Sequence, residues 1–149
     1  VGVYDARRWV GPSYRTMGLY GCDLIGDLRT MPVQTASVDA LIVTEVLEHC
    51  EQPFDAMREA HRVLKPGGLL LVTSPFIWPW HGSKDYQDFW RFTHEGWRLL
   101  LKAFADVKVT PCAWTDEGRA AYHMLRRWEC MAWASLSHAT TGYLCEATK

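Results

Sequence analysis

Two carboxylates and an imidazole follow a short apolar run, and their types and spacing could support chemistry. The run covers residues 40–43, and Glu45, Glu48 and His49 come just after it. Carboxylate oxygens and an imidazole nitrogen are ligands that can hold a divalent ion such as Mg²⁺ or Mn²⁺. The same residues can also do no more than support their loop. We favour that role and predict no metal ligand, with Glu48 hydrogen-bonded within its own loop and His49 turned into the fold.

A histidine and an acid follow the next apolar run, which covers residues 69–72. His81 could act as a general base on a substrate hydroxyl or amine, because an unperturbed imidazole titrates at about pH 6.5. It could instead anchor its loop through backbone hydrogen bonds. Asp88 could join the two glutamates and the first histidine at a metal ion, but the nearby Arg91 favours an ion pair that fixes the loop. We predict His81 as the catalytic residue.

The elements that must position these side chains form a strand, a helix and a second strand. The apolar runs at residues 40–43 and 69–72 predict strands that are covered on both faces. Between them, Pro53 suits the first turn of a helix at residues 53–65, and Pro66-Gly67-Gly68 suits its end. Such a unit predicts a parallel sheet, in which ligands lie at the carboxyl ends of the strands.

Further elements are predicted on the C-terminal side of this unit. Thr93 can cap a helix whose apolar residues recur at helical spacing up to Phe104. Period-two alternation at residues 106–110 and 143–147 predicts two strands near a sheet edge. The remaining predicted elements are short strands at residues 1–5 and 24–27 and a helix that begins near Glu117.

The stretch from Val38 to Pro75 resembles the middle of the class I S-adenosylmethionine-dependent methyltransferases, especially the methyltransferase type 11 group. Its EVLEH turn and RVLKPGG helix end carry the resemblance. The resemblance implies an α/β, Rossmann-like fold with helices on both faces, strand order 3-2-1-4-5-7-6, and S-adenosylmethionine as cofactor. No G-x-G-x-x-G loop occurs, so we expect residues 1–149 to be one partial domain, truncated before strand 1 and inactive alone. A complete protein that has lost the loop is the alternative.

The resemblance also implies an acid that accepts hydrogen bonds from the ribose hydroxyls of the cofactor. Asp5 closes the predicted first strand and fits this role. Tyr4 departs from the usual family pattern before the acid, and this leaves Asp23 as a competing candidate. A solvent-exposed turn acid is the plain alternative for Asp5.

Four more positions are implied to contact the cofactor. The segment Gly26-Asp27-Leu28 resembles the family segment whose acid accepts from the adenine amino group, with Leu28 packed on the ring. Asp27 could also simply cap a short turn. Thr44 and Glu45 end the first buried strand, and the resemblance places them near the sulfonium and methionine part of the cofactor.

Composition excludes some partners. Sixteen basic and 17 acidic side chains leave a net charge of -1, which gives no field to attract nucleic acid or an anionic membrane. No apolar run approaches the roughly 20 residues that span a bilayer, and nothing at the start is typical of a signal peptide. Five widely spaced cysteines suit free thiols. We therefore expect a cytoplasmic protein.

Methyl transfer to an oxygen, nitrogen or carbon of a small molecule is the function that these patterns favour. One alternative is a non-catalytic binding or scaffold module that keeps the fold without the cofactor. Another is a different Rossmann-type nucleotide-binding enzyme, but that class requires a glycine fingerprint that this sequence lacks.

Overall fold

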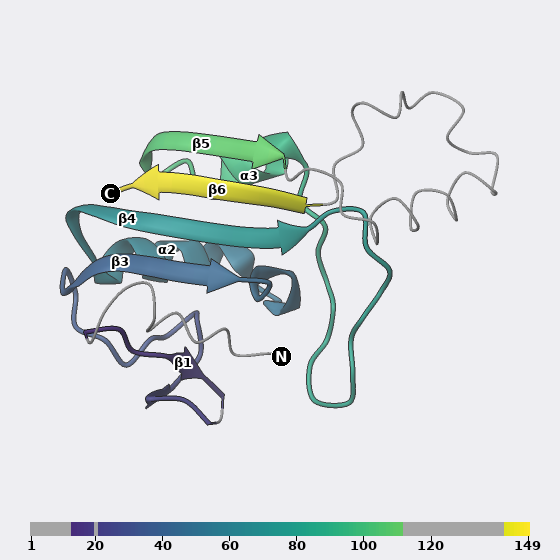
Figure 1. Ribbon diagram of the computed structural model, residues 1–149, viewed down its shortest axis with the longest axis horizontal. Helices are drawn as coiled ribbons and strands as arrows, with labels where there is room; N and C mark the ends of the chain where they lie inside the picture. Colours follow the sequence, from purple (N-terminus) through teal and green to yellow (C-terminus); the bar gives the residue numbers. More distant parts are fainter. Residues whose placement is uncertain (1–12, 20, 112–141) are drawn as a thin grey trace.

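A four-stranded sheet forms the centre of the molecule (Figure 1). The computed structural model describes residues 13–19, 21–111 and 142–149. The strands of the sheet are β3 (Val38–Thr44), β4 (Leu64–Pro75), β5 (Ala105–Pro111) and β6 (Gly142–Thr148), in the spatial order β3-β4-β6-β5. β3 and β4 are parallel, whereas β6 is antiparallel to both β4 and β5. This order matches the 4-5-7-6 part of the predicted sheet.

The remaining elements are short. β1 (Met17–Gly18) and β2 (Leu24–Ile25) pair as a separate parallel two-stranded sheet. A 3₁₀ turn, η1 (Leu47–His49), follows β3, and the helices are α2 (Pro53–Val63) and α3 (His94–Leu100). The predicted strand at residues 1–5 and the predicted helix near Glu117 lie outside the described residues. None of the described helices is long and apolar enough to cross a bilayer.

Helix α2 connects β3 to β4 as the sequence predicts, but it ends earlier than expected. Leu64 adopts an extended backbone (φ -67°, ψ 139°) and already belongs to β4, where it pairs with Val38. Gly67 has a φ of +74°, which suits glycine, and the β3–β4 register shifts next to this segment. Lys65 does not extend the helix, because its ammonium bonds to Asp39 of β3 at 2.7 Å.

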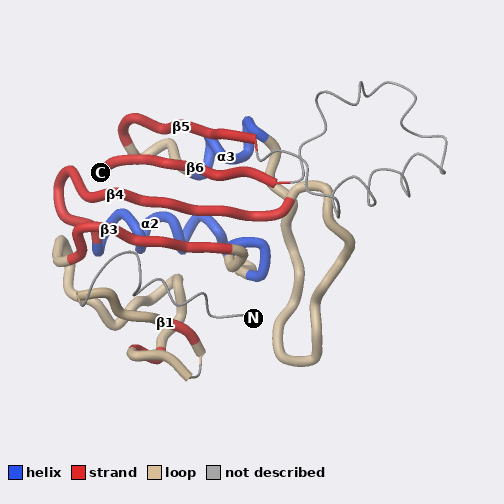
Figure 2. The backbone as a smooth tube through the Cα atoms, in the orientation of Figure 1, coloured by secondary structure: helices blue, strands red, loops and turns tan. Residues whose placement is uncertain are grey.

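The core lies between one face of the sheet and the two helices, which contact each other (Figure 2). Leu70 and Val72 of β4 point to this face and are fully buried. Side chains on the opposite face of the sheet are more exposed: Leu69 of β4 is 38% exposed, and Ile42 of β3 is 37% exposed. β5 lies at the edge and β6 lies beside it, between β4 and β5, so both strands lie near a sheet edge as predicted.

The carboxyl ends of β3 and β4 meet at one edge of the sheet, as expected for parallel strands. The loop at residues 76–93 leaves β4 and runs past this edge before the chain reaches α3 (Figure 1). Backbone amides of Phe89 and Trp90 donate to the carbonyl oxygen of Glu48 at 2.8 and 3.2 Å. The hydroxyl of Thr93 then accepts from the amide of Gly96 and caps α3 as predicted. The two loops that carry the candidate residues are therefore joined.

Candidate functional site

Glu45 turns the chain out of β3. Its φ of +51° lies in the left-handed region, which is sparsely populated by residues other than glycine. The turn is held from β4, because the Glu45 amide donates to the carbonyl oxygen of Thr73 at 3.1 Å and its carboxylate accepts from the Thr73 hydroxyl at 2.7 Å. Thr44 and Glu45 are both exposed at the edge of the sheet where the sequence predicts them.

Glu48 is fully buried, and its environment contradicts the prediction that its carboxylate is hydrogen-bonded within its own loop. Neither carboxylate oxygen has a hydrogen-bond partner in the part of the chain that the structure describes, so the expected bonds within its own loop are absent there. Burial raises the pKa of Glu48 to about 7, and the charge of Glu45 contributes in the same direction. The nearest basic groups are the Nε2 atoms of His49 at 3.7 Å and His81 at 3.8 Å.

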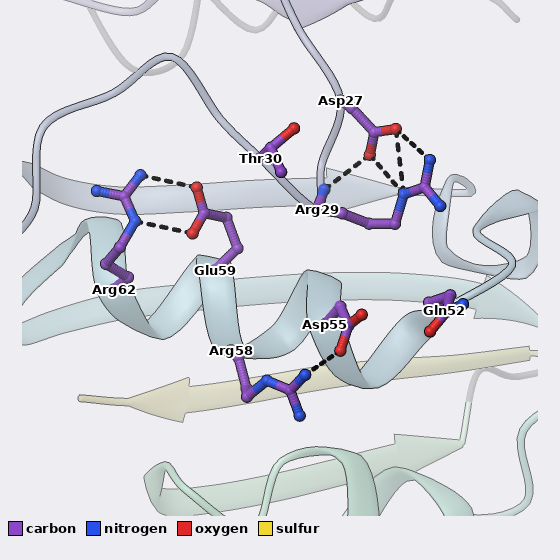
Figure 3. Close-up of a pocket in the computed structure, with 8 residues that line it drawn as sticks. All are labelled: Asp27, Arg29, Thr30, Gln52, Asp55, Arg58, Glu59 and Arg62. Carbon is purple, nitrogen blue, oxygen red and sulfur yellow. Dashed lines mark hydrogen bonds and ion pairs between the residues drawn. The ribbon is translucent and has the colours of Figure 1, made fainter.

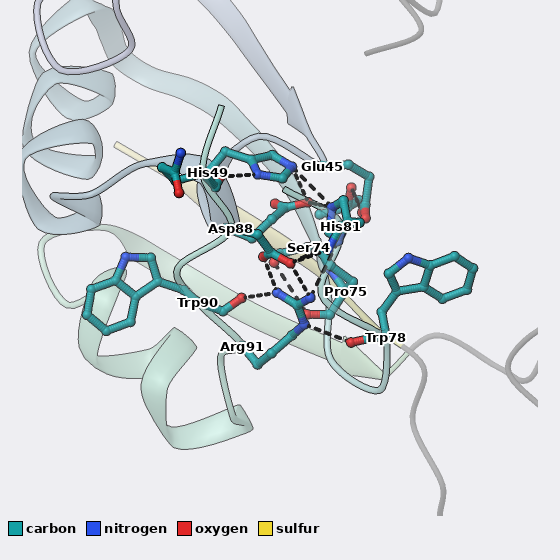
Figure 4. A network of polar contacts seen from close by, with 12 residues as sticks. Glu45, His49, Ser74, Pro75, Trp78, His81, Asp88, Trp90 and Arg91 are labelled. Carbon is teal, nitrogen blue, oxygen red and sulfur yellow. Dashed lines mark hydrogen bonds and ion pairs between the residues drawn. The ribbon is translucent and has the colours of Figure 1, made fainter. Parts of the chain in front are cut away.

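The rings of His49 and His81 lie next to each other (Figure 4). Their Nε2 atoms are 3.1 Å apart, and their rings meet edge to face. The other ring nitrogen of His49 lies 2.6 Å from the carbonyl oxygen of Gln87. The other ring nitrogen of His81 lies 3.1 Å from a carboxylate oxygen of Asp88. His49 is turned into the fold as predicted, with 11% of its side chain exposed.

Arg91 and Asp88 form the predicted ion pair that fixes the loop. The guanidinium bonds to both oxygens of Asp88, at 2.5 and 2.7 Å, and the Asp88 side chain is 1% exposed. Arg91 also donates to the carbonyl oxygens of Trp78 and Pro79, which connects the two arms of the loop. These contacts hold the pKa of Asp88 well below its ordinary value.

Only part of the metal set considered from the sequence comes together. Glu48 and His49 converge, but Glu45 is bound to Thr73 and Asp88 is bound to Arg91. His81 takes the third place in the cluster. The sequence contains the signal, because His81 follows β4, the strand parallel to β3. The sequence prediction places His81 at the substrate and does not include it in this group.

Asp27 lies at a charged hollow of about 540 Å³ beside the start of α2 (Figure 3). Its carboxylate accepts from the amide of Arg29 at 2.8 Å and makes three contacts with the Arg29 guanidinium. The hydrogen bond from Arg29 lowers the pKa of Asp27. Asp27 therefore caps a turn in this conformation. Leu28, next to it, packs partly buried against the core.

The two candidates for the ribose acid differ in what can be described. Asp5 lies outside the described residues. Asp23 accepts hydrogen bonds from both the amide and the hydroxyl of Thr16, at 2.8 and 3.0 Å, and so connects the two strands of the β1–β2 sheet. In this arrangement the Asp23 carboxylate stabilises a turn.

An ion pair on α2, between Glu59 and Arg62, holds the segment that follows Asp27. Glu59 accepts from Arg62 at 2.7 Å (Figure 3). Glu59 also accepts from the amide of Met31 at 2.8 Å, and Arg62 donates to the carbonyl oxygen of Val33. The hydrogen bond from Arg62 lowers the pKa of Glu59. The segment at residues 31–33 is thus attached to the helix through charged groups.

We expect the stability that Glu59 contributes to depend on pH. Because its pKa is lower in the folded protein, this contribution is present above the unfolded pKa of about 4.3 and disappears as pH falls through the folded value. Glu59→Gln should lower the urea midpoint at neutral pH, and the two proteins should converge in acid. Glu51→Gln, at an exposed position, is the control. A difference that stays constant from neutral pH to acid would contradict this account.

The fold and the polar edge together define a class of protein. A parallel β3–α2–β4 unit, with β6 inserted antiparallel between β4 and β5, is a Rossmann-like α/β arrangement of the class I methyltransferase type, as predicted. A family model described as a methyltransferase domain matches residues 14–72. Residues 14–72 are thus similar to a methyltransferase domain. The prediction from EVLEH and RVLKPGG, a likeness to the class I S-adenosylmethionine-dependent methyltransferases, is confirmed.

Individual relatives match parts of the chain. A probable S-adenosylmethionine-dependent methyltransferase of Mycolicibacterium smegmatis is 40% identical over 50 residues, which cover 34% of this chain and 20% of that protein. An uncharacterized 37.1 kDa protein in transposon TN4556 of Streptomyces fradiae is 41% identical over 51 residues, which cover 34% of this chain and 15% of that protein. The matched parts are thus a small fraction of both relatives.

Solved structures support the fold. Phosphoethanolamine N-methyltransferase 2 of Haemonchus contortus, in complex with S-adenosyl-L-methionine, superimposes with a TM-score of 0.56 and 15% identity. The superposition covers 83% of this chain and 36% of that enzyme. At this identity the likeness concerns the fold alone.

Proposed function

We propose that the chain contributes to an enzyme that transfers a methyl group from S-adenosylmethionine to an oxygen, nitrogen or carbon of a small molecule. One observation carries the proposal: in a methyltransferase-type sheet, exposed polar residues gather where the carboxyl ends of β3 and β4 meet, at Thr44 and Glu45. Ligands of doubly wound sheets lie at this edge. The balanced charge favours a small acceptor over a nucleic acid, and we propose a cytoplasmic location.

The residues assigned to the cofactor fit it in part. The exposed carboxylate of Glu45 is held at the edge of the sheet by the hydroxyl of Thr73. A carboxylate attracts the positive sulfur of the cofactor electrostatically. Leu28 offers apolar surface to a ring. Asp27 fits only if Arg29 turns away, because the amide and guanidinium of Arg29 occupy both of its oxygens. Asp5 is proposed for the ribose on the resemblance alone.

S-adenosylmethionine, when bound, supplies a methyl group on a positive sulfur, so little acid–base help is required. The residues of the chain then have to orient the acceptor and exclude water, which accounts for much of the rate in such reactions. His81 lies on the neighbouring loop, with Nδ1 at 3.1 Å from the carboxylate of Asp88 and Nε2 at 3.1 Å from Nε2 of His49. We assign His81 to the acceptor, whose proton its Nε2 can take.

Calorimetric titration of S-adenosylmethionine into the full-length protein tests the cofactor site. Asp27→Asn should weaken binding by roughly 1–3 kcal/mol, because the adenine amino group loses a charged acceptor. Asp55→Asn changes an acid of the same hollow that pairs with Arg58, and it should bind as the wild type does.

Arg29→Met separates a direct contact from an indirect one. If Asp27 accepts from adenine, removing its competitor Arg29 leaves binding unchanged or tighter. If Asp27 acts only by fixing Arg29, both variants weaken binding equally, and the adenine assignment is wrong. A wild-type protein that binds neither S-adenosylmethionine nor its demethylated product would instead favour the non-catalytic module.

A further inference from the structure

Three potential ligand atoms converge at the edge between β3 and β4. They are the Nε2 atoms of His49 and His81 and one carboxylate oxygen of Glu48. Their separations are 3.1 Å between the nitrogens and 3.7 and 3.8 Å from each nitrogen to the same oxygen. Such a compact group of two imidazoles and a carboxylate is a set that can hold a metal ion.

The triangle has the size that a bound ion requires. The circle through its three corners, with sides of 3.1, 3.7 and 3.8 Å, has a radius of about 2.1 Å. A point therefore exists that lies about 2.1 Å from all three atoms, and zinc–nitrogen and zinc–oxygen bonds measure about 2.0–2.2 Å. An ion slightly above the plane would draw the three ligands a few tenths of an ångström together.

The contacts of the two Nδ1 atoms favour a proton on each of them. The Nε2 atoms then direct lone pairs toward the centre of the cluster. Nδ1 of His49 faces the carbonyl oxygen of Gln87, which can only accept, so this nitrogen carries the proton. Nδ1 of His81 lies 3.1 Å from the carboxylate of Asp88, 3.3 Å from the carbonyl oxygen of Pro79 and 3.4 Å from Nη2 of Arg91, so two acceptors and one donor face it. We assign the proton to this nitrogen because the two acceptors are nearer than the donor. Bonds of this kind orient the histidines of metal sites and raise their basicity.

Three acceptors then face one another without a donor among the described residues. Both Nε2 atoms bring lone pairs, and the fully buried carboxylate of Glu48 has no hydrogen-bond partner there. A buried acceptor without a partner is costly, and a buried charge more so. With both Nδ1 atoms protonated, a cation or an extra proton has to occupy the centre of this group. The alternative is a proton on one Nε2 that is donated to the other Nε2 at 3.1 Å.

We propose that Glu48, His49 and His81 bind one divalent transition-metal ion, of which Zn²⁺ is the type. Imidazole ligands suit zinc and its neighbours, whereas Mg²⁺ prefers oxygen ligands in an octahedron. Three protein ligands leave a position open, as in catalytic zinc sites. Glu48 closes the buried side and the more exposed His81 lies on the solvent side, with 31% of its side chain exposed.

The open position deepens the proposed function, on which this step rests. An acceptor hydroxyl held there would lose its proton to water more readily, because a divalent ion lowers the pKa of a bound O–H group. The oxygen then forms the new bond to the methyl carbon as the carbon–sulfur bond breaks and its electron pair returns to sulfur. His81 acts on the acceptor through the ion in this case and does not remove the proton itself. The acceptor class is a small molecule with a hydroxyl.

Metal titration of the full-length protein tests the site itself. The protein is stripped with a chelator and titrated with Zn²⁺ alone and with Co²⁺ alone, followed by elemental analysis after dialysis and by the visible absorption of Co²⁺. We expect about one equivalent of ion, with Mg²⁺ binding far more weakly. His81→Asn, His49→Asn and Glu48→Gln should each weaken binding by at least about tenfold.

His94→Asn is the matched control, because His94 lies on α3 and interacts with Arg98, away from the cluster. A wild-type protein that retains no more Zn²⁺ than His81→Asn does, or a His94→Asn variant that loses binding equally, overturns the proposal and leaves the extra proton as the occupant. His81 is in a partly exposed loop, so its variant remains informative if Glu48→Gln fails to fold.

The two proposals fail separately. Calorimetry with S-adenosylmethionine is repeated on the stripped protein. Binding of S-adenosylmethionine without retention of Zn²⁺ rejects the metal site and keeps the proposed function. Retention of Zn²⁺ without binding of S-adenosylmethionine keeps the metal site and rejects the function.

Discussion

Replacement of Trp97 by alanine should lower the free energy of unfolding by about 3–5 kcal/mol, because a large aromatic side chain leaves a cavity that the core fills only in part. Trp97 lies on α3 and is fully buried. Its ring lies 5.0 Å from that of Phe92, so the side chain joins the helix to the end of the loop at residues 76–93. Urea unfolding followed by circular dichroism measures the loss.

Two variants on and near this position control the experiment. Leu99→Ala alters the same helix at a side chain that is 54% exposed, and it should cost no more than about 0.5 kcal/mol. Trp97→Phe should cost less than alanine, since the indole N–H has no acceptor among the described residues and its removal relieves an unsatisfied donor. Equal losses from Trp97→Ala and Leu99→Ala would contradict the description of the core.

The local elements could be predicted because their signals lie within the elements themselves. Pro53 and an apolar stripe mark α2, and the hydroxyl of Thr93 caps α3 as expected. The end of α2 was placed two residues too late, because Lys65 can complement a helix end or reach a neighbouring strand. Its bond to Asp39 depends on the β3–β4 pairing, which no local pattern contains.

The position of β6 illustrates a different limit of local patterns. Alternation at residues 143–147 indicates that the two faces of the strand differ in burial. Cys145 is buried, whereas Leu144 is half-buried. It does not report whether both edges of the strand are paired. The insertion of β6 between β4 and β5 follows from pairing over more than 30 residues of sequence, for example Val109 with Cys145.

The candidate site could be predicted in its location but not in its composition. Residues after β3 and β4 must share an edge, and this placed Glu48, His49, His81 and Asp88 near one another. The sequence allowed Asp88 two roles, an ion pair with Arg91 or a metal ligand. The structure assigns it to Arg91, with both oxygens engaged, and brings His81 to the cluster. The lack of a hydrogen-bond partner for the Glu48 carboxylate among the described residues could not be predicted without knowing that its loop is buried.

Replacement of Arg91 by methionine should lower the free energy of unfolding by about 2–3 kcal/mol. Removing one partner of a fully buried pair costs about 3–5 kcal/mol, because the other charge is left without compensation. The loss is smaller here, since Arg91 keeps 23% of its side chain exposed and water can replace part of the pair. Fluorescence of Trp78, Trp80 and Trp90 in the same loop follows the transition.

A double variant separates the ion pair from the packing of Arg91. Asp88→Asn combined with Arg91→Met removes both charges and should be more stable than Arg91→Met alone, whereas additive losses would show that the pair is not the source of the effect. Arg98→Met, at an exposed position of α3, is the surface control. Arg91→Met should leave binding of Zn²⁺ nearly intact if Asp88 still orients His81, and Asp88→Asn should weaken it about 10–100-fold. Equal metal binding in both variants would mean that the Asp88–His81 contact at 3.1 Å does not orient the ring.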